Sequence, residues 1–202
     1  MLSHSKTPIW RPALVSMGLF TALLGAAYPL AVTGVANAAF PAQAGGSLVR
    51  DDAGKVVGSA LIGQAFAKPE YFHGRPSAAG NGYDAGASSG SNMGPLNDKL
   101  IEREKTEAAS LRAENRDAAI PADAVTTSAS GLDPDISPAN ARFQAPRVAQ
   151  ARGVPEKAVL ATIEQHVDQP LLGFIGQPRV NVLMLNRALD ARFPPNSHNK
   201  GG

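Results

Sequence analysis

The stretch ALVSMGLFTALLGAAYPLAVTGV, residues 13–35, decides the architecture of this 202-residue chain. No charged side chain occurs between Pro12 and Val49. A helix of about 20 apolar residues crosses the roughly 30 Å hydrocarbon core of a bilayer. The sequence therefore predicts one transmembrane signal anchor over residues 13–36.

The charges on either side of this stretch predict its orientation. Lys6 and Arg11 precede it without a nearby acid, and Arg50 is the first charge after it. Because basic residues are retained on the cytoplasmic side, residues 1–12 are expected in the cytoplasm and residues 40–193 outside. The expected topology is therefore a single pass, with the N-terminus in the cytoplasm and the C-terminal domain outside.

A cleaved signal peptide is the alternative interpretation. Ala36-Asn37-Ala38 matches an A-x-A cleavage site, but the apolar run is longer than the 7–15 residues usual in signal peptides. Length favours the uncleaved anchor. The alternative function is an exported hydrolase or a periplasmic binding module released by cleavage, which the mass of the mature chain would reveal.

One face of the predicted anchor is lined by small residues. Gly18, Ala22, Gly25 and Ala26 recur at spacings of three and four, and such a stripe lets another helix approach closely. Glycine and alanine are also simply common in membrane helices. Pro29 removes one helical hydrogen bond and is expected to kink the last third of the helix.

Composition excludes several classes of function. The absence of cysteine excludes disulfides, cysteine-ligated zinc and a thiol nucleophile. Of the 19 basic residues two precede the apolar stretch, which leaves 17 to balance the 17 acidic ones. The neutral C-terminal part therefore gives no reason to expect nucleic acid as a partner.

The rest of the chain predicts one α+β domain with a short β-hairpin and several helices. The hairpin is expected over 47–50 and 55–62, around the turn Asp52-Ala53-Gly54. An extended segment is expected over 120–128, and the tail 194–202 is expected to be disordered. The predicted helices are 95–115, 138–152, 155–167 and 182–190, and Asn181 can cap the last of these.

Local signals give the helix ends. Ser91 or Asn92 is expected to cap the first of these helices, and Ser137 before Pro138 is a strong start for the second. Pro146 is expected to break or restart that second helix, which Gly153 ends.

Motifs for catalysis are weak. The four histidines are scattered, so no metal site is predicted. The match of residues 86–90 to G-x-S-x-G lies in a glycine-rich loop, without the strand and helix that a nucleophile elbow needs.

Two clusters have competing interpretations. Asp133-Pro134-Asp135 could offer carboxylates to a cation, but a turn leading into the following helix is favoured. Tyr71, Phe72 and Arg75 are compatible with a recognition loop or with a small core cluster under the glycine-rich loop.

Six ordered blocks of sequence resemble one protein family. Besides the anchor with Tyr28-Pro29, these are YFHGRPSA at 71–78, GSNMGP at 90–95, TTSASGLDPDISP at 126–138, PRVAQARG at 146–153 and GQPRVNVLMLNRALD at 176–190. Together they are similar to the C subunit of the Kdp potassium-transporting ATPase, over residues 13–193.

The resemblance implies a non-catalytic accessory subunit of an ATP-driven, high-affinity potassium importer. The implied location is the bacterial inner (plasma) membrane, with a single pass and a periplasmic or extracellular C-terminal domain. The implied partners are a potassium-channel-like subunit, a P-type ATPase subunit and a small single-span subunit. The implied role is to stabilise the assembly and to promote ATP binding and turnover as a catalytic chaperone. ATP and Mg act on the ATPase subunit, which carries the phosphorylated aspartate, and K⁺ is the transported ion.

The resemblance also suggests contact residues. The subunit-interface candidates are Tyr71, Phe72, Arg75, Asn92, Asp133 and Asp135. The family is credited with nucleotide contact, for which Ser130 and Gln144 are the weak candidates. The missing phosphate loop and the predicted topology, opposite the ATP-hydrolysing domain, argue against such contact and favour coupling through the anchor and the domain.

Overall fold

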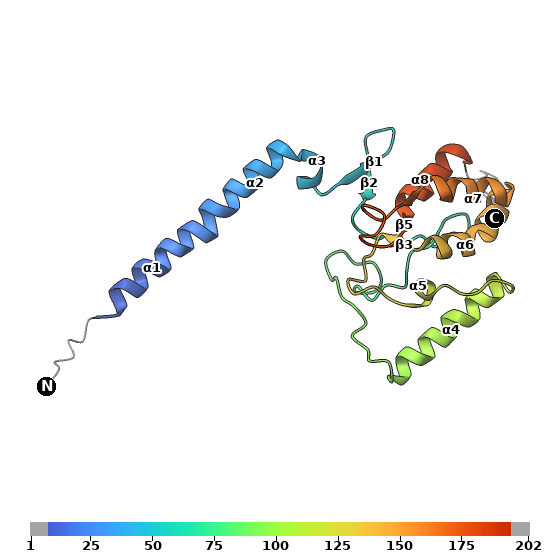
Figure 1. Ribbon diagram of the computed structural model, residues 1–202, viewed down its shortest axis with the longest axis horizontal. Coiled ribbons are helices and arrows are strands. Elements are labelled where there is room, and N and C mark those ends of the chain that lie inside the picture. The colour runs from blue at the N-terminus through green and yellow to red at the C-terminus, as the bar shows by residue number, and fades with distance from the viewer. Residues whose placement is uncertain (1–7, 195–202) are drawn as a thin grey trace, which may run out of the picture. The chain divides into compact units, whose positions relative to one another are not determined.

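The computed structural model describes residues 8–194 and divides into two compact units, with the division after Leu48 (Figure 1). Each unit is described by itself. The predicted ends of the chain at 1–7 and 195–202, with Lys6 and most of the expected disordered tail, lie outside the described residues. The α+β fold class is confirmed, with one apolar N-terminal helix, small sheets and several further helices.

The first unit is a single long helix followed by a short turn of helix. The segments α1 (Trp10–Ala22), η1 (Leu23–Ala27) and α2 (Tyr28–Ala39) are continuous, and α3 spans Pro41–Ala44. The helix is long and apolar enough to span a membrane. Its 30 residues exceed the predicted span at both ends and measure about 45 Å, more than a hydrocarbon core requires.

The helix contains a π-helical turn just before Pro29, and the kink expected at this proline stays a prediction. A proline cannot donate to the carbonyl four residues earlier, here Gly25, and its ring crowds that oxygen. The π turn over Leu23–Ala27 contains Gly25 and widens the helix there. Helical backbone continues into α2 on the far side.

The second unit is built around helices α6 (Pro138–Arg152), α7 (Glu156–Gln165) and α8 (Val182–Arg192) and a three-stranded antiparallel sheet. The sheet has the order β3 (Asp135–Ile136), β5 (Arg179–Asn181), β4 (Val167–Asp168). The register places Val180 opposite both Ile136 and Val167. These elements and Phe72 form one hydrophobic core, in which Val148, Val159, Ile163, Val180, Leu185 and Leu189 are fully buried.

Helix α6 contradicts the prediction of a break at Pro146. The helix runs through this residue to Arg152, and Gly153 ends it at φ 67° as expected. Buried Ala145 and Val148 flank the proline on both sides. Their burial, with that of the other core residues of α6, offsets the roughly 3 kcal/mol that an interior proline costs a helix.

The remaining elements surround this core. The predicted hairpin is confirmed as β1 (Leu48–Arg50) and β2 (Val56–Ser59), joined by a turn in which Asp51 accepts the backbone N–H of Ala53 and of Lys55. Helix α4 covers Asp98–Glu114. The expected extended segment at 120–128 instead contains the short helix α5 (Ala122–Val125).

The predicted caps of α6 and α4 had different outcomes. Ser137 caps α6 as expected, accepting the N–H of Asn140 at 3.0 Å. The predicted cap of α4 was wrong, because Asn97 rather than Ser91 or Asn92 accepts the N–H of Lys99, at 3.0 Å. Asn97, the asparagine nearest the helix, is the N-cap, and residues 91–96 are therefore loop.

Candidate functional site

Two buried side-chain amides hold residues 72 and 73 in extended form. Asn186 of α8 accepts the N–H of Phe72 at 2.8 Å and donates to its carbonyl at 3.0 Å. Gln144 of α6 does the same for His73, at 2.8 and 3.1 Å. Each amide thus imitates the edge of a neighbouring strand, and the segment is clamped between two helices. We call residues 71–77 the clamped segment.

The side chains at the start of the clamped segment are part of the interior. Phe72 has no exposed area and belongs to the core, so its assignment as a partner-contacting residue is corrected to a core role. Tyr71 is half-buried, with its hydroxyl 3.3 Å from Asp190 and the buried Arg152 guanidinium 5.2 Å above its ring. Burial first, and then the Asp190 carboxylate, raise the pKa of Tyr71.

Arg75 anchors the clamped segment to the loop before β3. Its guanidinium lies 3.1 Å from Asp133 and also donates to the carbonyls of Thr126 and Thr127. Tyr83 donates its hydroxyl to the carbonyl of Arg75. Blocks 71–78 and 126–138 of the sequence therefore meet through this arginine.

The two aspartates of the 133–135 turn have separate roles. Asp133 accepts the N–H of Asp135 at 3.0 Å, which is the turn that the sequence analysis favoured over a cation site. Asp135 lies 3.1 Å from Arg179 of β5, which also reaches Asp168 at 3.7 Å. Burial raises the pKa of Asp135, and Arg179 opposes that shift. Among residues 8–194 no group of three or more ligating side chains could hold a metal ion.

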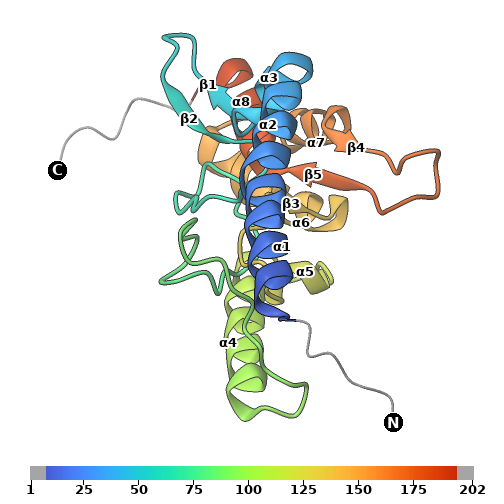
Figure 2. The same ribbon diagram turned by 90° about the vertical axis from the view of Figure 1, so that its left-hand side faces the viewer.

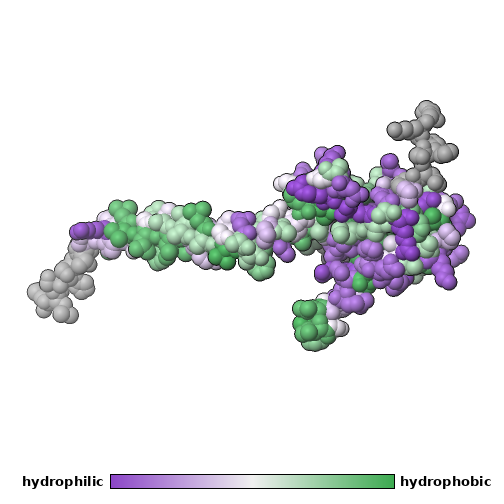
Figure 3. Space-filling view, turned by 90° about the horizontal axis from the view of Figure 1, so that it is seen from above, coloured by the Kyte–Doolittle hydropathy of each residue, from purple (hydrophilic) through white to green (hydrophobic). Residues whose placement is uncertain are grey.

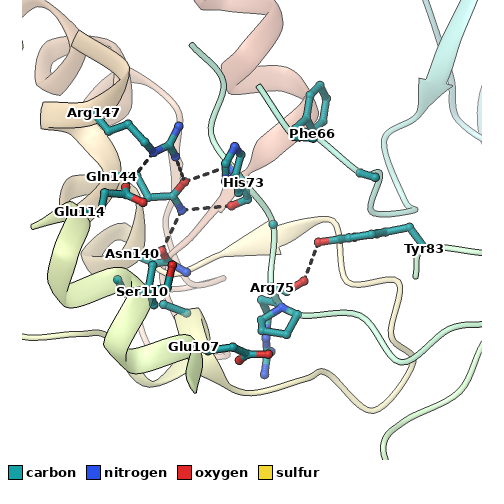
Figure 4. Close-up of a pocket in the computed structure, with 16 residues that line it drawn as sticks. Phe66, His73, Arg75, Tyr83, Glu107, Ser110, Glu114, Asn140, Gln144 and Arg147 are labelled. Carbon is teal, nitrogen blue, oxygen red and sulfur yellow. Dashed lines mark hydrogen bonds and ion pairs between the residues drawn. The ribbon is translucent and has the colours of Figure 1, made fainter. Parts of the chain in front are cut away.

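A cavity of about 390 Å³ lies beside the clamped segment, between α4, α6 and residues 65–67 (Figure 4). Arg147 bridges its wall, with Nε 2.7 Å from Glu114 and Nη2 2.7 Å from Gln144. Burial and the Arg147 charge lower the pKa of His73, and burial raises the pKa of Glu107. Arg147, Glu114, Gln144 and His73 thus form a bonded polar network in a wall that also has many apolar residues.

The nucleotide candidates are not brought together. Both polar atoms of the Gln144 amide are already occupied by protein partners. Ser130 is not a lining residue of that cavity. Its hydroxyl instead accepts the N–H of Leu132, and its carbonyl accepts the Ser88 hydroxyl of the G-x-S-x-G match. The residues present do not fit a nucleotide site.

Asn92, the remaining interface candidate, lies on the exposed loop before α4 with φ 52°. Asparagine tolerates this left-handed conformation better than most residues. The structure thus keeps Asn92 on the surface.

In the first unit the four predicted small residues share one face of the helix. Gly18, Ala22, Gly25 and Ala26 line a shallow groove together with Leu14, Met17 and Thr21. A Cβ added at Gly18 would meet nothing within 4 Å. The groove is therefore open to another helix, as the small-residue pattern requires.

The sequence analysis missed a second apolar surface. Residues 170–176, P-L-L-G-F-I-G, form the end of the β4–β5 hairpin, and their four large apolar side chains are 51–76% exposed. Figure 2 shows this hairpin projecting from the rest of its unit. An apolar run between two prolines, without a core-facing period, was the available signal. We call residues 170–176 the apolar tip.

The chain thus combines one long apolar helix with a folded domain in which many polar side chains bind one another. The family model for the K⁺-transporting ATPase c chain, KdpC, matches residues 10–191. The chain belongs to this family. Its members are non-catalytic subunits of a potassium-transporting ATPase complex, and K⁺ is the transported ion.

Individual relatives agree over nearly the whole chain. A potassium-transporting ATPase KdpC subunit of Caulobacter vibrioides is 79% identical over 202 residues, all of both chains. The subunit of the same name from Caulobacter sp. strain K31 is 73% identical over the same length. That of Beijerinckia indica is 60% identical over 186 residues, 91% of this chain and 94% of the relative. Family membership excludes the hydrolase alternative.

Proposed function

We propose that the chain is a single-pass subunit of the bacterial inner membrane, with residues 1–12 in the cytoplasm and residues 40–193 on the opposite side. The helix Trp10–Ala39 supports the span, since none of its residues is buried within the chain. The basic residues before the helix support the orientation.

The partners that follow from this proposal are the other subunits of the importer: a potassium-channel-like subunit, the P-type ATPase subunit and a small single-span subunit. The chain stabilises their assembly and promotes ATP binding and turnover by the ATPase subunit. ATP and Mg act there and not on this chain. Potassium passes through the partner subunits.

One observation carries the proposal of docking rather than chemistry. The polar side chains of the sequence motifs form hydrogen bonds within the chain, as Arg75, Gln144 and Asn186 illustrate. The exposed apolar features include the small-residue face of the helix and the apolar tip. Surfaces of this kind bind other proteins or lipid and have no nucleophile or base.

The interface candidates act in two ways in this proposal. Asn92 contacts a partner directly, since it is exposed. Tyr71, Arg75, Asp133 and Asp135 are half-buried and hold the loops in the shape that docks.

The effect on ATP turnover is a coupling between binding events. A bound subunit changes the activity of its partner only if it binds the partner's conformations with different affinity. The helix and the domain both contact the complex in this proposal, so they favour the conformation of the ATPase subunit that binds ATP better.

The test places two bulky side chains on the small-residue face. Gly18→Leu with Gly25→Leu keeps the partner helix away, so we expect the complex to lose this subunit during detergent extraction, together with ATP-driven potassium uptake. Subunit stoichiometry and ATPase activity are measured in the same purified sample.

The matched control adds two leucines to the opposite face of the same helix, at Ala13 and Ser16. The 3.6-residue repeat places them about half a turn away from Gly18. Full assembly of both double variants would show that the small-residue face contacts lipid and would contradict the proposal.

A further inference from the structure

Helix α4 has charged side chains on the side that it turns toward its own unit. The face of the second unit seen in Figure 3 is largely hydrophilic, as is usual where charged side chains meet water. In α4, however, Arg103, Glu104 and Glu107 are half-buried. None of the 17 residues of the helix is fully buried. The unit therefore gives α4 little hydrophobic stabilisation.

Two of these charged side chains are buried without the hydrogen bonds that they need. Among the described residues 8–194, the buried side-chain atoms that have no hydrogen-bond partner are Nε and Nη2 of Arg103 and Oε2 of Glu107. The Arg103 Nε lies 3.7 Å from Glu107 Oε1, beyond hydrogen-bond distance. Removing a charged group from water costs free energy, and no hydrogen bond offsets that cost here. Burial accordingly raises the pKa of Glu107.

The two ends of α4 are attached differently. At the C-terminal end, Glu114 binds Arg147 at 2.7 Å, and the Asn115 amide donates to the carbonyl of Phe143 at 3.1 Å. Within the described part of the chain, residues 98–113 form hydrogen bonds and ion pairs only inside the helix and with its cap. Polar contacts therefore hold the helix to its unit at one end alone.

Local signals keep α4 helical without support from the unit. Asn97 caps its first turn, Asp98 lies in that turn and Arg112 lies in the last turn, so both charges match the helix dipole. Most of its residues are alanine, leucine, glutamate, lysine or arginine, which favour the helix. The helix can therefore move as one rigid element.

We propose that α4 is a lid that swings about its C-terminal end at Glu114 and Asn115. In the closed position it forms one wall of the 390 Å³ cavity beside the clamped segment (Figure 4). In the open position Arg103 and Glu107 regain contact with water, and the cavity is accessible from the α4 side. This inference is independent of the proposed assembly, because every contact that it uses lies within the chain.

The first test measures distances between α4 and the rest of its unit in the full-length chain in detergent. The chain has no cysteine, so spin labels attach only at an introduced pair. Lys99→Cys at the start of α4 is combined with Lys157→Cys or Gln177→Cys, and all three positions are exposed. A helix of 17 residues is about 25 Å long, so a swing of about 30° moves its first turn by more than about 10 Å.

Pulsed electron resonance should give two distance populations for Lys99→Cys with at least one of the two references. Arg112→Cys lies beside the hinge and is the matched control, for which one population is expected. A single narrow population for every pair would overturn the inference. A continuous spread of distances from Lys99→Cys would overturn it as well, because it would mean that α4 unfolds instead of swinging.

The second test removes the unpartnered groups. Arg103→Met with Glu107→Leu replaces them with apolar side chains that favour the helix, so the open population should fall at least about tenfold. The matched control, Glu102→Leu with Lys105→Met, removes one acid and one base from exposed positions of the same helix and should leave the open population within about twofold. Equal open populations in the two variants would show that the unpartnered pair does not drive the swing and would overturn the inference.

Discussion

The clamped segment at 71–77 and the apolar tip at 170–176 have the same length and opposite chemistry. The first contains Tyr, Phe, His and Arg, a composition that is common in interfaces, yet it lies between two helices with its backbone bound by Asn186 and Gln144. The second has a plain aliphatic composition, but its side chains face outward. Residue types alone therefore do not distinguish an interface from the interior.

The difference arises from where the backbone polar groups find partners. In the clamped segment each buried N–H and C=O needs a bond, and the amides of α6 and α8 supply these at residues 72 and 73. In the tip, the backbone N–H and C=O groups of Leu171 and Ile175 bind each other within the turn. No second element is therefore needed to supply hydrogen bonds to them. A self-satisfied turn can project its side chains into solvent or into a partner.

Exchanging phenylalanine for alanine in each region gives the largest expected contrast. Phe72→Ala empties a fully buried core site and should lower the free energy of unfolding by about 3–5 kcal/mol. Phe174→Ala removes a side chain that is 76% exposed and should change it by less than about 0.5 kcal/mol. Thermal unfolding of the full-length chains in detergent, followed by circular dichroism, measures both. Similar losses would mean that the tip packs against its own unit.

Much of this fold was predictable because local signals and tertiary packing agree in most elements. Ser137, Gly153 and Asn181 mark helix ends in the sequence and do so in the structure. The uncharged run at 13–35 predicts the long helix. Local rules failed at Pro146, where packing on both sides outweighs the cost of a proline, and at Asn97, where a nearer cap was available.

The site was less predictable because its residues meet only in three dimensions. Arg75 and Asp133 were both candidates, but no local rule pairs residues 58 positions apart. Asn186 forms two hydrogen bonds with the backbone of Phe72, which lies 114 positions earlier in the sequence. A single amide side chain in a helix gives no sequence pattern that would predict such a contact. The apolar tip was overlooked for a different reason, since exposure depends on what a hairpin leaves uncovered.

A second contrast compares two arginine–aspartate pairs of equal length. Arg75–Asp133 in the clamped segment and Arg179–Asp135 at the base of the tip are both 3.1 Å apart, but the arginine side chains are 24 and 61% exposed. Arg75→Ala also removes donors to Thr126 and Thr127, so we expect a loss of about 1.5–3 kcal/mol in unfolding free energy.

The corresponding change at the tip should cost less. Arg179→Ala breaks a pair that water and salt screen, and about 0–1 kcal/mol is expected. Urea unfolding at low and high salt separates the two, since only the exposed pair should weaken with salt. A larger loss of unfolding free energy for Arg179→Ala than for Arg75→Ala would contradict the expectation that the pair in the clamped segment is the more stabilising of the two.

The smallest expected effect is the pH dependence that His73 of the clamped segment contributes to stability. Burial and Arg147 lower the pKa of His73, while Glu114 and the Lys68 carbonyl oppose this. As pH falls past the ordinary histidine value of about 6.5, the unfolded chain binds a proton before the folded chain does. The stability that the neutral imidazole contributes is therefore complete above that value and is lost as pH falls toward the lowered pKa of the folded state.

His73→Gln removes this titration, so wild type should lose more stability than the variant between pH 7.5 and pH 5. The apolar tip has no titratable side chain between residues 169 and 178, and Gln177→His supplies the matched control. An exposed histidine there has nearly the same pKa in both states and should leave the pH slope of stability at the wild-type value. Unfolding of the three full-length chains at both pH values measures the slopes. Equal slopes for His73→Gln and wild type would show that the imidazole is as well hydrated as a residue of the tip, and the contrast between the two regions would then not extend to their electrostatics.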